Sequence, residues 1–173
     1  AAIQATGGRV LDHHSDQDHN RTVITFVGDA ATVEAAAYAA IAKAAELIDL
    51  NHHHGEHPRI GATDVVPFVP LEGATIQDCI AIARRLGERV GNSLNIPVYL
   101  YEAAATRSDR VNLEDIRKGN YEGLKIEVAT NPDRKPDFGP SSLGSAGATV
   151  IGARAPLIAF NVYLNTSDVV IAR

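Results

Sequence analysis

The chain has 173 residues, of which 45% are hydrophobic and 21% charged. This composition and length fit one globular domain, or at most two small ones, with a core of its own. The net charge of -5 gives no support for nucleic-acid or membrane-surface binding, since both require a basic face. Cys79 stands alone, which excludes a disulfide framework and a CxxC metal knuckle, and no apolar run approaches the roughly 18–20 residues of a membrane span. We therefore expect a soluble cytoplasmic protein.

The first part of the chain predicts two strands followed by a long helix. Arg9–Leu11 and Thr22–Val27 have the apolar and β-branched residues that are typical of strands. Asp29 is a suitable N-cap for an alanine-rich helix over Ala31–Asp49. The expected buried face of this helix consists of residues at helical spacing, namely Val33, Ala37, Ile41, Ala44 and Ile48.

The middle of the chain repeats the alternation of strand and helix. Thr63–Pro70 is a short β-branched and aromatic run, which predicts a strand. Thr75 followed by Asp78 predicts a capped start for a second helix, and Val98–Tyr101 predicts the strand after it. The residues expected to face inward from this second helix are Ile76, Ile80, Ala83, Leu86, Val90 and Leu94.

The last part of the chain is expected to hold a short polar helix over Leu113–Leu124, a loop over Thr130–Gly147, and strands over Thr149–Gly152 and Leu157–Leu164. The whole order predicts an α/β or α+β fold, in which a mixed β-sheet has two main helices packed on one face. Two helices cannot cover both faces of such a sheet, so we expect the other face to be open to a partner subdomain or subunit.

All seven histidines precede residue 58, and they fall in two clusters that we expect in turn-like segments. Histidine can give and take protons near neutral pH, so either cluster could serve catalysis. Three consecutive rings cannot all point into one site, so we interpret His52, His53 and His54 as solvated. The complete clusters are His13, His14 and His19, then His52, His53, His54 and His57.

His57 has the neighbours that proton-transfer chemistry needs. The run Gly55–Asp64 combines an imidazole, two carboxylates and a guanidinium, with glycines that permit unusual backbone turns. Arg59 can hold a carboxylate through two hydrogen bonds, whereas Glu56 or Asp64 could orient the His57 ring. These residues therefore form our first candidate site.

Two further segments are candidates for binding. Arg21, with the amide of Asn20 beside it, could hold a second carboxylate, although a capped polar turn explains the same residues. The run Pro136–Gly147 is rich in glycine, serine and proline, so its backbone N–H groups could meet a flat ligand. A plain surface loop explains that composition equally well.

Several segments together resemble the N-terminal subdomain of the glutamate formiminotransferases, and the resemblance covers essentially all of residues 1–173. Gly55–Ala62, followed by Asp64 and Val65, resembles that family's GEHPRMGA-x-DV signature. The other matching segments follow in the family's order and are Asn20–Val23, Phe26–Gly28, Ile96–Tyr101, Asp137–Pro140, Gly147–Val150, Gly152–Arg154 and Leu157–Val162. The family's first strand and its C-terminal subdomain have no counterpart in this sequence.

The resemblance implies transfer of a formimino group from N-formimino-L-glutamate to tetrahydrofolate, in histidine degradation. It implies that His57 is the catalytic histidine and that the enzyme is a homodimer whose two subdomains enclose the folate. We expect Arg59 and Arg21 to bind substrate carboxylates with Asn20, Asp64 and Glu56 nearby, and we expect no metal. The residues that correspond to the family's folate-contacting stretch are Gly139, Pro140, Ser141, Ser142, Gly144 and Gly147.

Two other functions stay open at this point. Asp12-His13-His14, with Asp16 and Asp18, is similar to part of a metal-dependent phosphoesterase site, although that family needs further Asp motifs upstream. The second alternative is a non-catalytic folate-binding module or scaffold, because half of the family's architecture is absent. Transferase activity and metal content separate these possibilities.

Overall fold

The computed structural model describes residues 1–158, 162, 164–168 and 170–171, and its strands form two sheets. An antiparallel hairpin consists of β1 (Arg9–Asp16) and β2 (Arg21–Val27). A parallel sheet has the order β3-β5-β4, with β3 at Val65–Phe68, β4 at Val98–Glu102 and β5 at Thr149–Ala153. The α+β class is confirmed, with its strands divided between two sheets.

The two main helices form where their local signals predict them. Helix α2 (Ala30–Leu47) begins at Asp29, whose side chain accepts a hydrogen bond from the Thr32 N–H at 2.8 Å. Helix α3 (Ile76–Leu94) begins with a complete capping box between Thr75 and Asp78. Both caps satisfy backbone N–H groups that a helix start leaves without partners.

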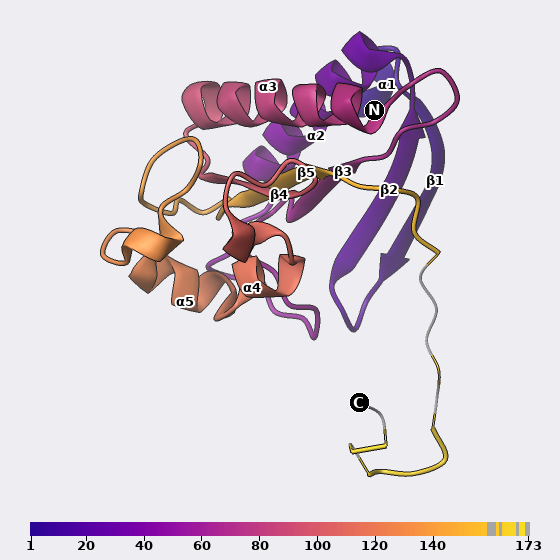
Figure 1. Ribbon diagram of the computed structural model, residues 1–173. Coiled ribbons are helices and arrows are strands. Elements are labelled where there is room, and N and C mark those ends of the chain that lie inside the picture. The colour runs from indigo at the N-terminus through magenta and orange to yellow at the C-terminus, as the bar shows by residue number, and fades with distance from the viewer. Residues whose placement is uncertain (159–161, 163, 169, 172–173) are drawn as a thin grey trace.

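Helices α2 and α3 cover one face of the parallel sheet, as Figure 1 shows. Alternate residues of β4 point to this face, where Val98 and Leu100 join the first core. Helix α3 contributes Leu86 and Val90, which are fully buried. The predicted inward-facing set is therefore largely correct, although Ile76, Ile80 and Leu94 are only partly buried.

The other face of the parallel sheet is covered by the chain itself, which corrects the expectation of an open face. The segment predicted as one helix forms α4 (Leu113–Arg117) and α5 (Asn120–Glu127), which lie on the opposite side of the sheet from α3 (Figure 1). They break apart at Gly119, whose φ is +82°. The second core consists of Ile60, Tyr99, Tyr101, Ile116, Leu124, Val128, Ala148 and Val150.

The open sheet surface lies in the hairpin, where Leu11, Val23 and Ile24 are 53%, 47% and 47% exposed. Strand β1 runs to Asp16 and is thus longer than predicted. His13 and His14 consequently lie within a strand and not in a turn, because their backbones pair with the β-branched residues of β2. Gln17–Asn20 form the turn between the two strands.

The remaining elements are short, and they are helix α1 (Ala2–Ala5) and the 3-10 turns η1 (Ser108–Arg110) and η2 (Pro132–Arg134). Turn η2 lies inside the segment Thr130–Gly147 that was predicted as a loop. The predicted strand Leu157–Leu164 falls largely outside the described residues. Within the part of the chain that the structure describes, no helix has the length and apolar character to cross a membrane.

Candidate active site

The segment that carries His57 is an irregular connection between α2 and β3, so its contacts with neighbouring elements determine its shape. On one side it meets the hairpin turn. The side-chain amide of Asn20 donates to the His54 carbonyl at 2.8 Å, and the Glu56 N–H donates to the Asp18 carbonyl at 3.1 Å. Gly55 permits this approach, because a Cβ there would lie 2.5 Å from the His19 carbonyl oxygen.

On its other side the same segment crosses the chain just before β5. The Ala148 N–H donates to the Ile60 carbonyl at 2.9 Å, and the Ala62 N–H donates to the Ala146 carbonyl at 2.9 Å. A Cβ at Gly61 would overlap the Ala148 carbonyl group. The signature segment is thus held between the hairpin turn and the predicted folate-contacting stretch.

The imidazole of His57 faces the start of β2. Its Nε2 lies 3.2 Å from Nη1 of Arg21, although the two residues are 36 positions apart in the chain. A guanidinium can only donate, so this contact requires an unprotonated Nε2 and a neutral ring. The His19 ring lies edge-on to the His57 ring, with 6.2 Å between centroids.

The surroundings of His57 favour its neutral form. Partial burial, and then the positive charges of Arg117 and Arg21, lower the pKa of His57 below its ordinary value. The carboxylate of Asp64 opposes this shift only in part. A neutral imidazole is the state that can accept a proton from a substrate.

The Asp64 carboxylate contacts a backbone N–H group of its own segment and the guanidinium of Arg117. Its Oδ1 accepts a hydrogen bond from the Ile60 N–H at 2.8 Å, and its Oδ2 pairs with Arg117. Glu56 is exposed. Among the hydrogen bonds of the described residues, neither carboxylate contacts His57. Sequence reasoning did not identify Arg117, because a single arginine at the end of a short polar helix carries no motif.

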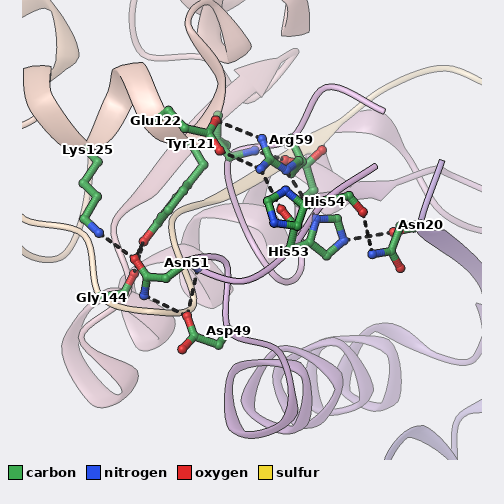
Figure 2. A network of polar contacts seen from close by, with 12 residues as sticks. Asn20, Asp49, Asn51, His53, His54, Arg59, Tyr121, Glu122, Lys125 and Gly144 are labelled. Atoms are coloured by element: carbon green, nitrogen blue, oxygen red, sulfur yellow. Dashed lines mark hydrogen bonds and ion pairs between the residues drawn. The ribbon is translucent and has the colours of Figure 1, made fainter. Parts of the chain in front are cut away.

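Arg59 is engaged by a residue of helix α5. Its guanidinium donates two hydrogen bonds to the Glu122 carboxylate, at 3.0 and 2.7 Å, as Figure 2 shows. This hydrogen bonding raises the pKa of Arg59, and the Arg59 side chain is only 14% exposed. The cation in direct contact with His57 is therefore Arg21, whereas Arg59 is directed toward Glu122.

The predicted folate-contacting stretch divides into a packed part and an exposed part. Gly139 has φ of +84°, and a Cβ there would lie 2.6 Å from the Ile96 carbonyl oxygen. Gly147 packs against Ile60 in the same way. Between them Ser141, Ser142 and Gly144 are exposed, and Pro140 is half-buried. The outer glycines are thus needed for packing, and the accessible backbone lies between them.

The residues of the phosphoesterase alternative lie along β1, except Asp18, which lies in the turn that follows it. Because side chains alternate across a strand, Asp12 and His14 point to one face and His13 to the other. Across residues 1–158 and the described remainder, no three His, Cys, Asp or Glu side chains gather in a way that could hold a metal ion.

Comparison with known proteins identifies the family of the chain. Residues 1–154 match the family described as formiminotransferase domain, N-terminal subdomain. The chain is 52% identical, over 95% of its length, to the glutamate formimidoyltransferase of Thermoplasma acidophilum and covers 55% of that protein. It is 47% identical to the enzyme of the same name from Streptococcus pyogenes, over 96% of its length and 56% of the relative.

A longer relative is the formimidoyltransferase-cyclodeaminase of Rattus norvegicus, to which the chain is 47% identical over 95% of its length and 30% of that protein. The chain thus spans about half the length of the glutamate formimidoyltransferases that it matches. Because the family match extends over nearly all of its residues, the chain belongs to the formiminotransferase family and forms its N-terminal subdomain.

Proposed function

We propose that the protein containing this chain is a glutamate formimidoyltransferase. It transfers the formimino group of N-formimino-L-glutamate to N5 of tetrahydrofolate, as a step of histidine degradation. We propose further that it acts in the cytoplasm as a homodimer, together with a C-terminal subdomain. The observation that best supports this proposal is the contact between the His57 imidazole and Arg21, at the centre of the segments that match the family.

His57 acts in this proposal as the general acid/base. It accepts the proton of the attacking N5 nitrogen as the new C–N bond forms. It then donates that proton to the glutamate nitrogen, so that the old C–N bond breaks and glutamate leaves neutral at nitrogen. Such proton transfer contributes about 10²–10⁴-fold to a rate. Alignment of the two substrates supplies most of the remainder.

Formiminoglutamate has two carboxylates, and we propose that Arg21 binds one of them. Arg21 is exposed and adjacent to the His57 ring, so it is the first anchor, with Asn20 beside it. Arg59 forms an ion pair with Glu122, and Asp64 forms one with Arg117, so these charges already have partners within the protein. We therefore assign Arg59, Asp64 and Glu56 to the surroundings of the substrate and Arg21 to direct contact with it.

For tetrahydrofolate we propose contact with the accessible part of the stretch from Gly139 to Gly147. A Cβ at Gly144 would meet no atom within 4 Å, so a ligand can approach the backbone there. Ser141 and Ser142 are exposed and could donate hydrogen bonds to it. No metal ion takes part in the proposed reaction.

A direct assay tests the proposed function. This chain is assayed alone and with the C-terminal half of the Thermoplasma acidophilum relative, using formiminoglutamate and tetrahydrofolate. Formimino transfer that persists after chelator treatment is expected in at least one of these forms, called the active form below. Folate binding without turnover in both forms would favour the scaffold alternative. Activity that chelation removes and a metal restores would favour the metal-dependent one.

The pH dependence of turnover gives a second test. Neutral His57 is the reactive form and its pKa is lowered, so the acidic limb of kcat/KM is expected below the ordinary range of histidine. Arg21→Gln removes one nearby positive charge, so the pKa of His57 rises and the limb moves to higher pH. Arg9→Gln, at the other end of the hairpin, is the control and leaves the limb unchanged. An unmoved limb in Arg21→Gln contradicts the assignment.

A further inference from the structure

The ion pair between Arg59 and Glu122 joins the His57 segment to helix α5, as Figure 2 shows. The Glu122 carboxylate accepts hydrogen bonds from both terminal nitrogens of the guanidinium, at 3.0 and 2.7 Å. The same guanidinium donates to the His53 carbonyl at 3.2 Å. A bidentate pair of this kind fixes the orientation of the arginine as well as its position.

Backbone and side-chain contacts of α5 hold the same segment at two points. The Tyr121 N–H donates to the Arg59 carbonyl at 2.9 Å. Further back, the Asn51 side-chain oxygen accepts hydrogen bonds from the Tyr121 hydroxyl at 2.9 Å and from Lys125 at 2.6 Å. The first two turns of α5 thus hold both ends of the segment that contains His57 (Figure 2).

Helix α5 is anchored in the second core, whereas the segment that contains His57 has no regular secondary structure. Tyr121 and Leu124 are 3% and 0% exposed in the second core. The segment has no helix or strand from Asp49 to Arg59, and it meets the hairpin turn through exposed side chains and through the backbone hydrogen bond from the Glu56 N–H to the Asp18 carbonyl. The position of His57 relative to the core therefore depends on α5 as well as on the hairpin turn and the chain before β5.

We infer that Glu122 is a positioning residue for His57: it holds Arg59, two residues along the chain, and so sets where the imidazole meets the substrate. The inference rests on the proposed function of His57. Glu122 is 63% exposed, and ion pairs with such an exposed partner add little to the stability of a fold. Loss of Glu122 should therefore reduce turnover much more than stability.

The test compares Glu122→Gln with Glu127→Gln in the active form of the enzyme. Glu127 lies on the same helix and pairs with Arg134 at 3.3 Å, so it is a matched control. Glu122→Gln is expected to lower kcat on the order of 10- to 100-fold, because small displacements of a catalytic group cost that much. KM for formiminoglutamate and the melting temperature should change little. Glu122→Asp retains the charge and should recover part of kcat.

Two results would overturn the inference: an unchanged kcat in Glu122→Gln, or an equal loss of kcat in Glu127→Gln. An unchanged kcat with a lower KM for formiminoglutamate would mean that Arg59 is released to bind substrate. If the wild-type protein transfers no formimino group in any form, the proposed function fails and NMR decides the positioning separately. The ring signals of His57 must then change in Glu122→Gln and stay the same in Glu127→Gln, and unchanged signals in Glu122→Gln overturn the inference.

Discussion

His57→Ala is expected to lower kcat of the active form by about 10²–10⁴-fold, the usual contribution of a positioned acid/base group. The imidazole contacts Arg21 and moves a proton in the proposed reaction, and it is not one of the groups proposed to hold folate, so the dissociation constant of tetrahydrofolate should change little. Steady-state kinetics and folate titration measure the two quantities in one preparation.

His52→Ala is the control for this experiment, because the His52 side chain is 85% exposed and belongs to the neighbouring cluster. It should retain the wild-type kcat. Added imidazole should restore part of the turnover of His57→Ala, since a free base can occupy the space that the side chain leaves. A near-normal kcat in His57→Ala would remove His57 from the mechanism.

Asp137→Ala should destabilise the fold by about 3–5 kcal/mol, since it leaves the buried charge of Arg110 without its partner. The side chains of Arg110 and Asp137 are 5% and 8% exposed, and Nη1 of Arg110 lies 2.6 Å from Oδ2 of Asp137. Asp137 also accepts a hydrogen bond from the Leu100 N–H at 2.9 Å. This bond anchors β4 to the chain just before the stretch from Gly139 to Gly147. Urea unfolding measures the loss.

Asp133→Ala is the matched control in the same part of the chain. Asp133 pairs with Arg107 at 3.2 Å, but its side chain is 80% exposed, so its removal should cost less than about 1 kcal/mol. Equal losses of unfolding free energy in the two variants would show that burial does not decide the strength of these pairs.

Local signals predicted the helices well, because the residues that specify a helix start lie within one turn of each other. Asp29 and the pair of Thr75 and Asp78 make the predicted caps. The covered second face of the sheet was missed, since α4 and α5 are short and polar, and α4 buries only Ile116 while α5 buries only Tyr121 and Leu124. Their apolar side chains are buried against Tyr99 and Tyr101, which belong to a strand distant in sequence, so local patterns do not predict their burial.

The site was predictable in part, and for a similar reason. The residue types around His57 indicated acid/base chemistry, and the resemblance to a family joined them to Arg21, which spacing alone could not do. Glu122 and Arg117 could not be found, because each is one charge in a polar stretch. Their partners, Arg59 and Asp64, lie 63 and 53 positions away in the chain.

The crossing of two chain segments at Gly61 and Gly147 has a consequence for the evolutionary record of such enzymes. A Cβ at either residue would overlap backbone of the other segment, so selection removes substitutions there whether or not a ligand binds nearby. An invariant glycine at these columns of an alignment would report only that the two segments touch. Gly144 is free of this constraint, and variation there would follow the substrate. Purifying selection at Gly144 would therefore be better evidence for folate binding than invariance of Gly61 or Gly147.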